Sequence, residues 1–287
     1  MKNLVVRAVS GGVLVAVMIG AVLWSHASMG ALFALLMFGG LYEFYALARK
    51  CGYRPCYVIG AAAAACVFAA CYWLPALNIG VVVGSLLASV LLVPVLFISS
   101  LWRKSEHPLA DLGATFMGVL YVALPFGLLC LFDQLDFFPQ PRWSRAAFVI
   151  CYFLIIWAND VFAYLVGMAF GRHPLFPRHS PKKSWEGFFG GLLGALCVGG
   201  AIAYFAWGGV AWPLWLGLSL VVSVTGVAGD LVESMFKRTA GVKDSGNLIP
   251  GHGGVLDRFD AVLVSAALVF VYVGMSFPVS CTHLRAH

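Results

Sequence analysis

Long apolar runs separated by short polar segments make up most of this chain of 287 residues. Each run is close to the length of about 20 residues that a helix needs to cross the hydrocarbon core of a bilayer. The pattern predicts spans at residues 4 to 24, 28 to 48, 55 to 74, 79 to 101, 110 to 132, 146 to 170, 187 to 207, 210 to 228 and 260 to 278. The expected fold is therefore all-α, a polytopic integral membrane protein with about nine transmembrane helices.

Lysine and arginine residues gather in every second connection between the expected spans. Of the 18 such residues, 15 fall into five groups, at residues 2–7, 49–54, 103–104, 172–183 and 237–258. Basic residues beside membrane spans favour the cytoplasm, which predicts a cytoplasmic amino terminus and a carboxyl terminus outside. The odd number of spans independently requires the two termini to lie on opposite sides of the membrane.

Composition agrees with a membrane protein, because 62% of the residues are hydrophobic and only 10% are charged. The net charge of +6 could suggest a nucleic-acid partner. However, the basic residues are concentrated on one expected membrane face, which instead suits anionic lipid headgroups and phosphorylated ligands. We therefore expect contact with membrane lipid and no binding of nucleic acid.

The two halves of the chain differ in where their polar residues occur. Through about residue 140 the chain is nearly continuous span and short loop, which predicts a helical scaffold. Glu43, in this half, is interpreted as an interfacial carboxylate that could pair with Arg49 or Lys50. Residues 141–287 carry longer polar segments and are expected to be the catalytic half. Without an internal repeat or a soluble linker, the chain 1–287 is expected to form one integral membrane domain.

Asp160 lies near the middle of the sixth expected span, where a carboxylate is costly and needs a reason. It shares a helical face with Tyr164 and Gly167. In one interpretation the carboxyl group faces the helix bundle and bonds to Asn159 or Tyr164. In the other it belongs to an ion or substrate site, and the residues alone leave both open.

The segment after the sixth span ends in a basic pair. Ser180 followed by Pro181 predicts the N-cap and the first residue of the next helix. Lys182 and Lys183 would then lie on the first helical turn, where free backbone N–H groups favour an anion. The alternative is an ordinary cytoplasmic loop whose lysines serve only topology.

Residues 234–260 form the most polar segment of the chain and contain five glycines. Asp230 and Glu233 precede it at a spacing of three, which places them on one helical face, and Asp257 and Asp260 repeat this spacing at the segment's end. Hard carboxylate oxygens suit Mg2+, which usually takes one or two carboxylates together with water and substrate phosphates. Neighbouring lysines and arginines would neutralise phosphate oxygens. The segment predicts a metal and phosphate site, although a solvated helix end with a surface salt bridge is the simpler alternative.

The order of residues in this segment is specific enough to suggest a family. The residues that carry the similarity are Ser234, Lys237, Arg238, Lys243, Asp244, Pro250, His252, Gly253, Gly254, Asp257, Arg258 and Asp260. They resemble the signature of the phosphatidate cytidylyltransferases, also called CDP-diacylglycerol synthases. The SPKKSWEG segment and the number of spans are also similar to that family, so the resemblance covers essentially the whole chain. Two departures are Ser184, where threonine is expected, and Ser245, where a more apolar residue is usual and only loop packing is put in doubt.

The resemblance implies an Mg2+-dependent transferase in which CTP and phosphatidate give CDP-diacylglycerol and pyrophosphate. It places the enzyme in phospholipid biosynthesis at the bacterial inner membrane, with the active site facing the cytoplasm. A homodimer is expected from the resemblance alone, and the presence of a second cation stays open. Phosphoryl-type transfer consists largely of positioning and neutralising charge, so no nucleophilic side chain is expected.

The resemblance also assigns hypothetical roles to individual residues. Asp230, Asp257 and Asp260 are expected to bind the metal, and Asp160 and Glu233 are additional candidates. Lys237 and Arg238 are expected to act on the reacting phosphates. The expected substrate-binding residues are Ser180, Lys182, Lys183, Ser234, Lys243, His252, Gly253, Gly254 and Arg258.

Three other functions are considered. A secondary transporter for an anionic solute, with Asp160 as its coupling site, would show solute flux and no release of pyrophosphate. A CDP-alcohol phosphotransferase would need a DGxxAR motif, which this chain lacks. A purely structural membrane protein could carry charges on one side, but it would not explain the ordered polar segment.

Overall fold

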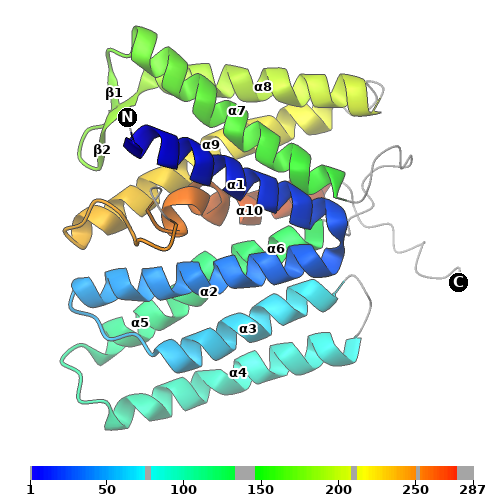
Figure 1. Cartoon of the computed structure of the whole chain (residues 1–287). Helices are drawn as coiled ribbons and strands as arrows, with labels where there is room; N and C mark the ends of the chain where they lie inside the picture. The colour runs from blue at the N-terminus through cyan, green and yellow to red at the C-terminus, as the bar shows by residue number, and fades with distance from the viewer. Residues whose placement is uncertain (1, 75–78, 133–145, 208–211, 250–252, 277–287) are drawn as a thin grey trace, which may run out of the picture.

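A computed structural model describes residues 2–74, 79–132, 146–207, 212–249 and 253–276. Helices make up most of the described chain (Figure 1), and one connection between them contains a short two-stranded hairpin. The elements are α1 (Lys2–Trp24), α2 (His26–Lys50), α3 (Tyr57–Trp73), α4 (Ile79–Trp102), α5 (Pro108–Gly118), the π-helical turn η1 (Val119–Ala123), α6 (Leu124–Phe132), α7 (Ala147–Phe170), β1 (Pro174–Phe176), β2 (Ser180–Ser184), α8 (Trp185–Trp207), α9 (Trp212–Thr239) and α10 (Leu256–Ser276).

The chain is a helical integral membrane protein, as the apolar runs predicted. In the described part, 7 helical segments are long and apolar enough to cross a membrane, and the unbroken run Pro108–Phe132 counts as one of them. Two further apolar helices, Ser10–Trp24 and Tyr57–Trp73, are shorter. The count of nine spans and the orientation of the termini stay predictions.

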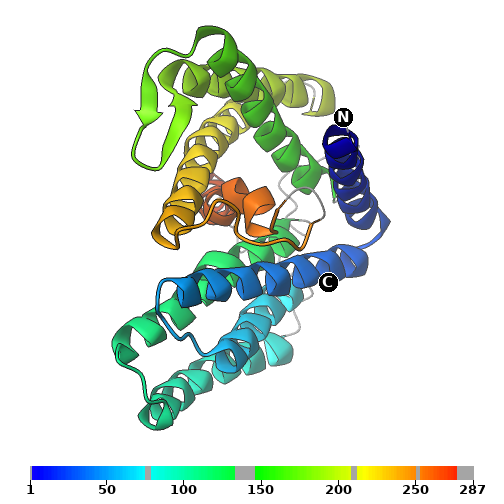
Figure 2. The same cartoon turned by 60° about the vertical axis from the view of Figure 1, so that its left-hand side comes forward.

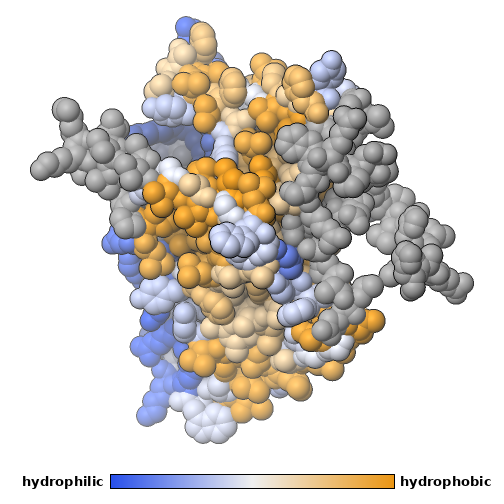
Figure 3. All heavy atoms as spheres, turned by 45° about the vertical axis from the view of Figure 1, so that its right-hand side comes forward, coloured by the Kyte–Doolittle hydropathy of each residue, from blue (hydrophilic) through white to orange (hydrophobic). Residues whose placement is uncertain are grey.

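Polar connections lie together at one end of the molecule. The loops at residues 51–56, 103–107, 171–184 and 240–249 all lie on the left in Figure 1. In the space-filling view, hydrophilic residues follow one edge while apolar residues cover most of the remaining described face (Figure 3). This separation is what the alternation of basic groups along the chain requires.

The fifth expected span contains an irregular turn that the sequence pattern did not predict. Within Pro108–Phe132 the helix widens at η1, where the N–H group of Leu124 donates to the carbonyl of Val119, five residues earlier. Pro125 has no N–H group to offer the carbonyl of Tyr121, and its ring crowds that turn, so a wider turn relieves both problems. Such π-helical turns occur frequently at functional sites.

The segment before α8 corrects the prediction that Ser180 caps this helix. Residues Ser180–Ser184 form β2, which pairs antiparallel with β1, and the helix begins only at Trp185. Ser184 is the residue whose Oγ accepts a hydrogen bond from Gly187 N, at 3.1 Å. The predicted anion cradle on a first helical turn at Lys182 and Lys183 is therefore wrong, because both lysines lie in a strand.

Close packing between α7 and α8 depends on glycines on one face of α8. A Cβ atom on Gly187 would lie 2.9 Å from the carbonyl oxygen of Ala163, and one on Gly191 would lie 2.7 Å from that of Asn159. Side chains at these positions would force the helices apart. This packing fixes α8, and with it the hairpin, against α7.

Helix α10 lies between two groups of helices. It packs against α9 on one side and against α6 on the other, and Figure 2 shows it between α7, α8 and α9 and the group from α2 to α6. Phe259, which is buried, contacts Phe126 of α6 at a ring distance of 5.4 Å and Phe153 of α7 at 6.4 Å. The first turn of α10 is thus held from both sides.

Candidate active site

Helices α9 and α10 cross at very close range, and this crossing creates the site. A Cβ atom on Gly229 would overlap the carbonyl oxygen of Asp260 and lie 3.3 Å from Ala261 Cα. A Cβ atom on Gly226, one turn earlier, would lie 3.4 Å from the Ala261 side chain. The absence of side chains on these glycines allows the two backbones to touch, so that residues next to the crossing share one small volume.

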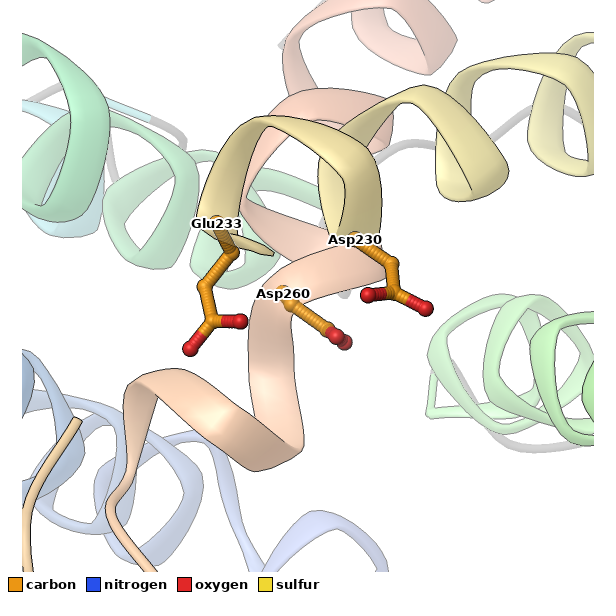
Figure 4. Close-up of side chains that lie close together, drawn as sticks. All are labelled: Asp230, Glu233 and Asp260. Atoms are coloured by element: carbon orange, nitrogen blue, oxygen red, sulfur yellow. The ribbon is translucent and has the colours of Figure 1, made fainter. Parts of the chain in front are cut away.

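Three carboxylates meet beside this crossing. Asp230 and Glu233 project from one face of α9, and Asp260 of α10 lies between them (Figure 4). One ligand oxygen from each lies within 4.8 Å of those of the other two. At that separation, two ionised carboxylates repel each other by about 3.5 kcal/mol for an effective dielectric constant of about 20. A divalent cation would remove this repulsion, and an all-oxygen donor set suits Mg2+.

Glu233 is the most deeply buried member of the group, with 1% of its surface exposed. Its Oε2 forms an ion pair with Lys237, one turn further along α9. Its Oε1 has no hydrogen-bond partner among the described residues. A buried carboxylate oxygen without a partner is costly, so Glu233 fits a site that is completed by a ligand.

Asp257 lies outside this group of three, although the sequence predicted it to be a metal ligand. Its Oδ1 accepts from Lys237 Nζ at 2.7 Å. Its Oδ2 accepts from Ser245 N at 2.9 Å, Ser245 Oγ at 2.8 Å and Gly254 N at 2.8 Å. Both oxygens are therefore engaged by the protein, and Asp257 joins the loop before α10 to the lysine on α9.

The hairpin brings one of the two predicted phosphate-binding lysines to the carboxylates. Lys183 Nζ lies 2.5 Å from Asp230 Oδ2, whereas Lys182 is exposed. Successive side chains of a strand point to opposite faces, so β2 can direct only one of the pair into the site. Ser180, on the other face from Lys183, is half-buried at the far end of the strand.

Asp160 lies close enough to Asp230 and Lys183 to interact with them electrostatically, but it is not part of the group of three. It accepts a hydrogen bond from Asn159 Nδ2 at 3.4 Å, as one of the two interpretations expected. Asn159 in turn accepts from Ser223 Oγ of α9 at 2.6 Å. This chain of contacts fixes α7 against α9 at the border of the site.

The remaining predicted residues occupy different environments. Ser234 Oγ donates to Asp230 Oδ1 at 3.2 Å and so supports a carboxylate of the group. Gly253 has a φ of 83°, a conformation that favours glycine. The next residue, Gly254, donates its N–H group to Asp257. His252 lies outside the described residues. The exposed basic side chains are those of Arg238, Lys243 and Arg258.

Two residues of the amino-terminal half were not predicted to take part. Glu43 is 2% exposed, and it accepts from Leu256 N and Ser245 Oγ. The interpretation as an interfacial partner of Arg49 is wrong, since Arg49 Nε donates to the carbonyl of Tyr45. A carboxylate in an apolar run was the available signal. The sequence near Glu43 contains nothing that identifies its distant partners.

Tyr121 is the second residue, and it reaches the site from η1. Its ring contacts Phe44 of α2 at 5.7 Å and Phe236 of α9 at 5.4 Å. Its hydroxyl is buried and has no hydrogen-bond partner among the described residues. The carboxylates of Glu233, Asp260 and Asp230 are the charged groups in its surroundings. The nearest sequence signal is Pro125, which favours the irregular turn.

The sequence matches the cytidylyltransferase family over residues 5–276, which is nearly the whole chain. The chain belongs to the cytidylyltransferase family. The residues of this cytidylyltransferase that carried the resemblance all lie within the matched region. The family suggested by the order of residues between Ser234 and Asp260 is thus confirmed.

Individual relatives of this cytidylyltransferase carry a more specific name. A protein named phosphatidate cytidylyltransferase from Staphylococcus aureus is 42% identical over 160 residues, which cover 56% of this chain and 58% of the relative. Proteins of the same name from Mycobacterium bovis and Mycobacterium tuberculosis are 39% identical over 163 residues, which cover 57% of this chain and 51% and 47% of those relatives. The similarity therefore spans about half of the length of these relatives.

Proposed function

We propose that this protein is a phosphatidate cytidylyltransferase, which converts CTP and phosphatidate to CDP-diacylglycerol and pyrophosphate. The observation that carries the proposal is the group formed by Asp230, Glu233 and Asp260, with Lys183 and Lys237 in direct contact with it. Carboxylates for a cation and lysines for phosphates meet beside membrane-spanning helices. A reaction between a lipid phosphate and a nucleoside triphosphate needs cation-binding carboxylates and phosphate-binding lysines in one place.

Mg2+ would be held by Asp230, Glu233 and Asp260, whose oxygens are close together and include one that has no hydrogen-bond partner among the described residues. When bound, the ion would neutralise charge on the nucleotide phosphates and polarise the phosphorus that is attacked. The geometry does not favour Asp257 as a ligand, because the protein engages both of its oxygens. A second cation has no separate donor group among the described residues.

The remaining residues bind and orient the two substrates. An oxygen of the phosphatidate phosphate forms a bond to the α-phosphorus of CTP. The bond from this phosphorus to the oxygen that bridges to the β-phosphorus breaks, and pyrophosphate leaves with that oxygen. Lys183 and Lys237 would neutralise phosphate oxygens, and the Tyr121 hydroxyl would donate a hydrogen bond to one of them. No general base is required, because a phosphate monoester has its second pKa at about 6.

The proposed site faces the cytoplasm of a bacterium, at the inner membrane, where CTP is available. The gathering of basic connections at the end of the molecule that also holds the loop at 240–249 supports this orientation. Association into a homodimer is also part of the proposal. It would leave the site within one subunit, because all three carboxylates come from α9 and α10 of one chain.

A direct test compares Asp230→Asn and Asp260→Asn with Glu106→Gln, which makes the equivalent change from carboxylate to amide at an exposed loop position outside the polar segment. Purified protein in detergent receives CTP, phosphatidate and Mg2+, and the CMP-bearing lipid and pyrophosphate are measured. We expect the two site variants to lose activity by about 100-fold or more, as for groups at a metal site, and Glu106→Gln to retain it. Full turnover in both site variants would exclude the assigned site, and solute flux without pyrophosphate would favour a transporter.

A further inference from the structure

Glu43 is a buried carboxylate in the half of the chain that was expected to be scaffold. It lies on α2, and 2% of its surface is exposed. Its Oε2 accepts from Leu256 N at 3.0 Å and from Ser245 Oγ at 3.1 Å. These contacts join positions that are 213 and 202 residues apart in sequence. A residue with only an interfacial role would not hold such partners.

The contact with Leu256 caps α10 from another helix. Leu256 is the first residue of α10, and the first N–H groups of a helix have no acceptor within the helix itself. A carboxylate at this position satisfies such a donor and interacts favourably with the helix dipole. Glu43 therefore determines where the helix that carries Asp257 and Asp260 begins.

The loop before α10 is shaped around the Glu43 carboxylate. A Cβ atom on Gly254 would lie 2.6 Å from Glu43 Cδ, and one on Gly246 would also lie 2.6 Å from it. Neither position can carry a side chain while Glu43 keeps its place. The loop backbone is thus closed over the carboxylate on two sides.

One face of α2 fits against the same region. A Cβ atom on Gly39 would lie 3.3 Å from Val255, and one on Gly40 would lie 3.4 Å from Leu256. Gly39 and Gly40 lie on the same side of α2 as Glu43, because they precede it by four and three positions. The end of α2 and the start of α10 are therefore packed directly together, with the carboxylate between them.

Ser245 connects this contact with the active site. Its Oγ lies 3.1 Å from Glu43 Oε2 and 2.8 Å from Asp257 Oδ2, and Asp257 in turn accepts from Lys237. A serine hydroxyl has one proton, so it can donate fully to only one of two carboxylates at a time. Ser245, which departs from the family pattern, thus connects Glu43 with Asp257 in addition to packing in the loop.

We propose that Glu43 is a positioning residue of the transferase, which sets the place of the first turn of α10 and thereby of Asp260 relative to Asp230 and Glu233. The proposal rests on the proposed function, because it assigns Glu43 a role in that reaction. Glu43 does not touch the substrates. It acts through Leu256, and through Ser245 on Asp257 and Lys237.

The first experiment compares Glu43→Ala and Glu43→Gln with Glu106→Gln, which makes the same conservative change at an exposed loop position. The concentration of Mg2+ needed for half-maximal turnover is measured together with kcat. We expect Glu43→Ala to raise this Mg2+ concentration and to lower kcat by about tenfold or more, as for residues that orient metal ligands. Glu43→Gln, whose amide oxygen can still accept from Leu256, should restore most of both values. A merely structural role would reduce the amount of folded protein without changing the Mg2+ concentration.

An unchanged Mg2+ requirement and kcat in folded Glu43→Ala would overturn the proposal. If that variant does not fold, Ser245→Ala, which removes one of the two donors to Glu43, takes its place under the same criteria. Hydrogen exchange at the Leu256 amide, measured without substrate, should become faster in Glu43→Ala and stay unchanged in Glu106→Gln. Because this exchange needs no turnover, an inactive wild-type protein would refute the proposed function, whereas unchanged exchange would refute the role of Glu43.

Discussion

Replacing Gly229 with alanine should damage the site without contacting any proposed substrate group. The added Cβ atom would overlap the carbonyl oxygen of Asp260 and lie 3.2 Å from its carbonyl carbon and 3.3 Å from Ala261 Cα. All three atoms belong to the α10 backbone, which cannot rotate away as a flexible side chain could. The helices must therefore separate at the point where their carboxylates meet.

The size of the effect follows from these distances. Carbon atoms pack favourably at about 3.5 to 4.0 Å, so α10 must move by roughly 0.5 to 1 Å to accept the methyl group. Overpacking of this kind costs about 1 to 3 kcal/mol, and alanine returns about 1 kcal/mol through its higher helix propensity. The net loss of stability is small. A misplacement of about 1 Å at a reacting centre can nevertheless reduce turnover by about 100-fold.

The assay measures kcat, the Mg2+ concentration for half-maximal turnover and the thermal unfolding midpoint of Gly229→Ala. Gly113→Ala is the matched control, because Gly113 is an exposed helical glycine with no atom within 4 Å of an added Cβ. We expect the control to keep its activity and to gain slightly in stability. Gly229→Ala should lose activity while most of it remains folded. Wild-type kcat and Mg2+ dependence in Gly229→Ala would refute the argument that the close crossing sets the positions of the carboxylates.

Three further results are expected. Lys183→Ala, which removes the contact with Asp230, should lower kcat/KM for CTP by about tenfold or more. Lys182→Ala, at the exposed neighbouring position, should have little effect. Equal losses in the two variants would contradict the argument that β2 directs only Lys183 into the site. Tyr121→Phe should leave the unfolding midpoint unchanged, because the hydroxyl has no hydrogen-bond partner within the described part of the chain, but should lower kcat by about tenfold. An unchanged kcat would remove Tyr121 from the proposed site. Removal of divalent cations with EDTA should abolish turnover, and addition of Mg2+ should restore it. Mg2+ should also raise the unfolding midpoint of the wild-type protein by more than it raises the midpoint of Asp230→Asn.

Most of the helical architecture follows from local pattern. Long apolar runs have one stable solution in a bilayer, because only a helix satisfies every backbone N–H and C=O group within its own segment. The sixth span, expected at residues 146 to 170, is observed as Ala147–Phe170. The eighth expected span corresponds to α9, which continues to Thr239, well beyond the expected end at residue 228; its polar last turns are still helical, and α10 packs against this helix.

Local sequence preferences were a less reliable guide where helix capping competed with strand pairing. Ser180 and Pro181 obey the preferences for a helix start, yet β2 occupies these positions, because pairing with β1 satisfies backbone groups there. The helix begins at Trp185, directly after Ser184, another serine, whose Oγ accepts from Gly187 N. Sequence preferences identified the right kind of residue, but tertiary contacts selected which serine acts as the cap.

A helical membrane protein, a polar segment that ends at Asp260 and the family of the chain could all be predicted without coordinates. These features depend on composition, spacing and residue order, which need no partner in space. The folded arrangement of the helices was needed to show that Glu233 joins Asp230 and Asp260, that Asp257 contacts Lys237 and the loop, and that Glu43 caps α10. The physical reason is that each of these assignments depends on how closely helices distant in sequence approach one another. That distance is set by glycines such as Gly229, which lets α10 approach α9 closely because it has no side chain.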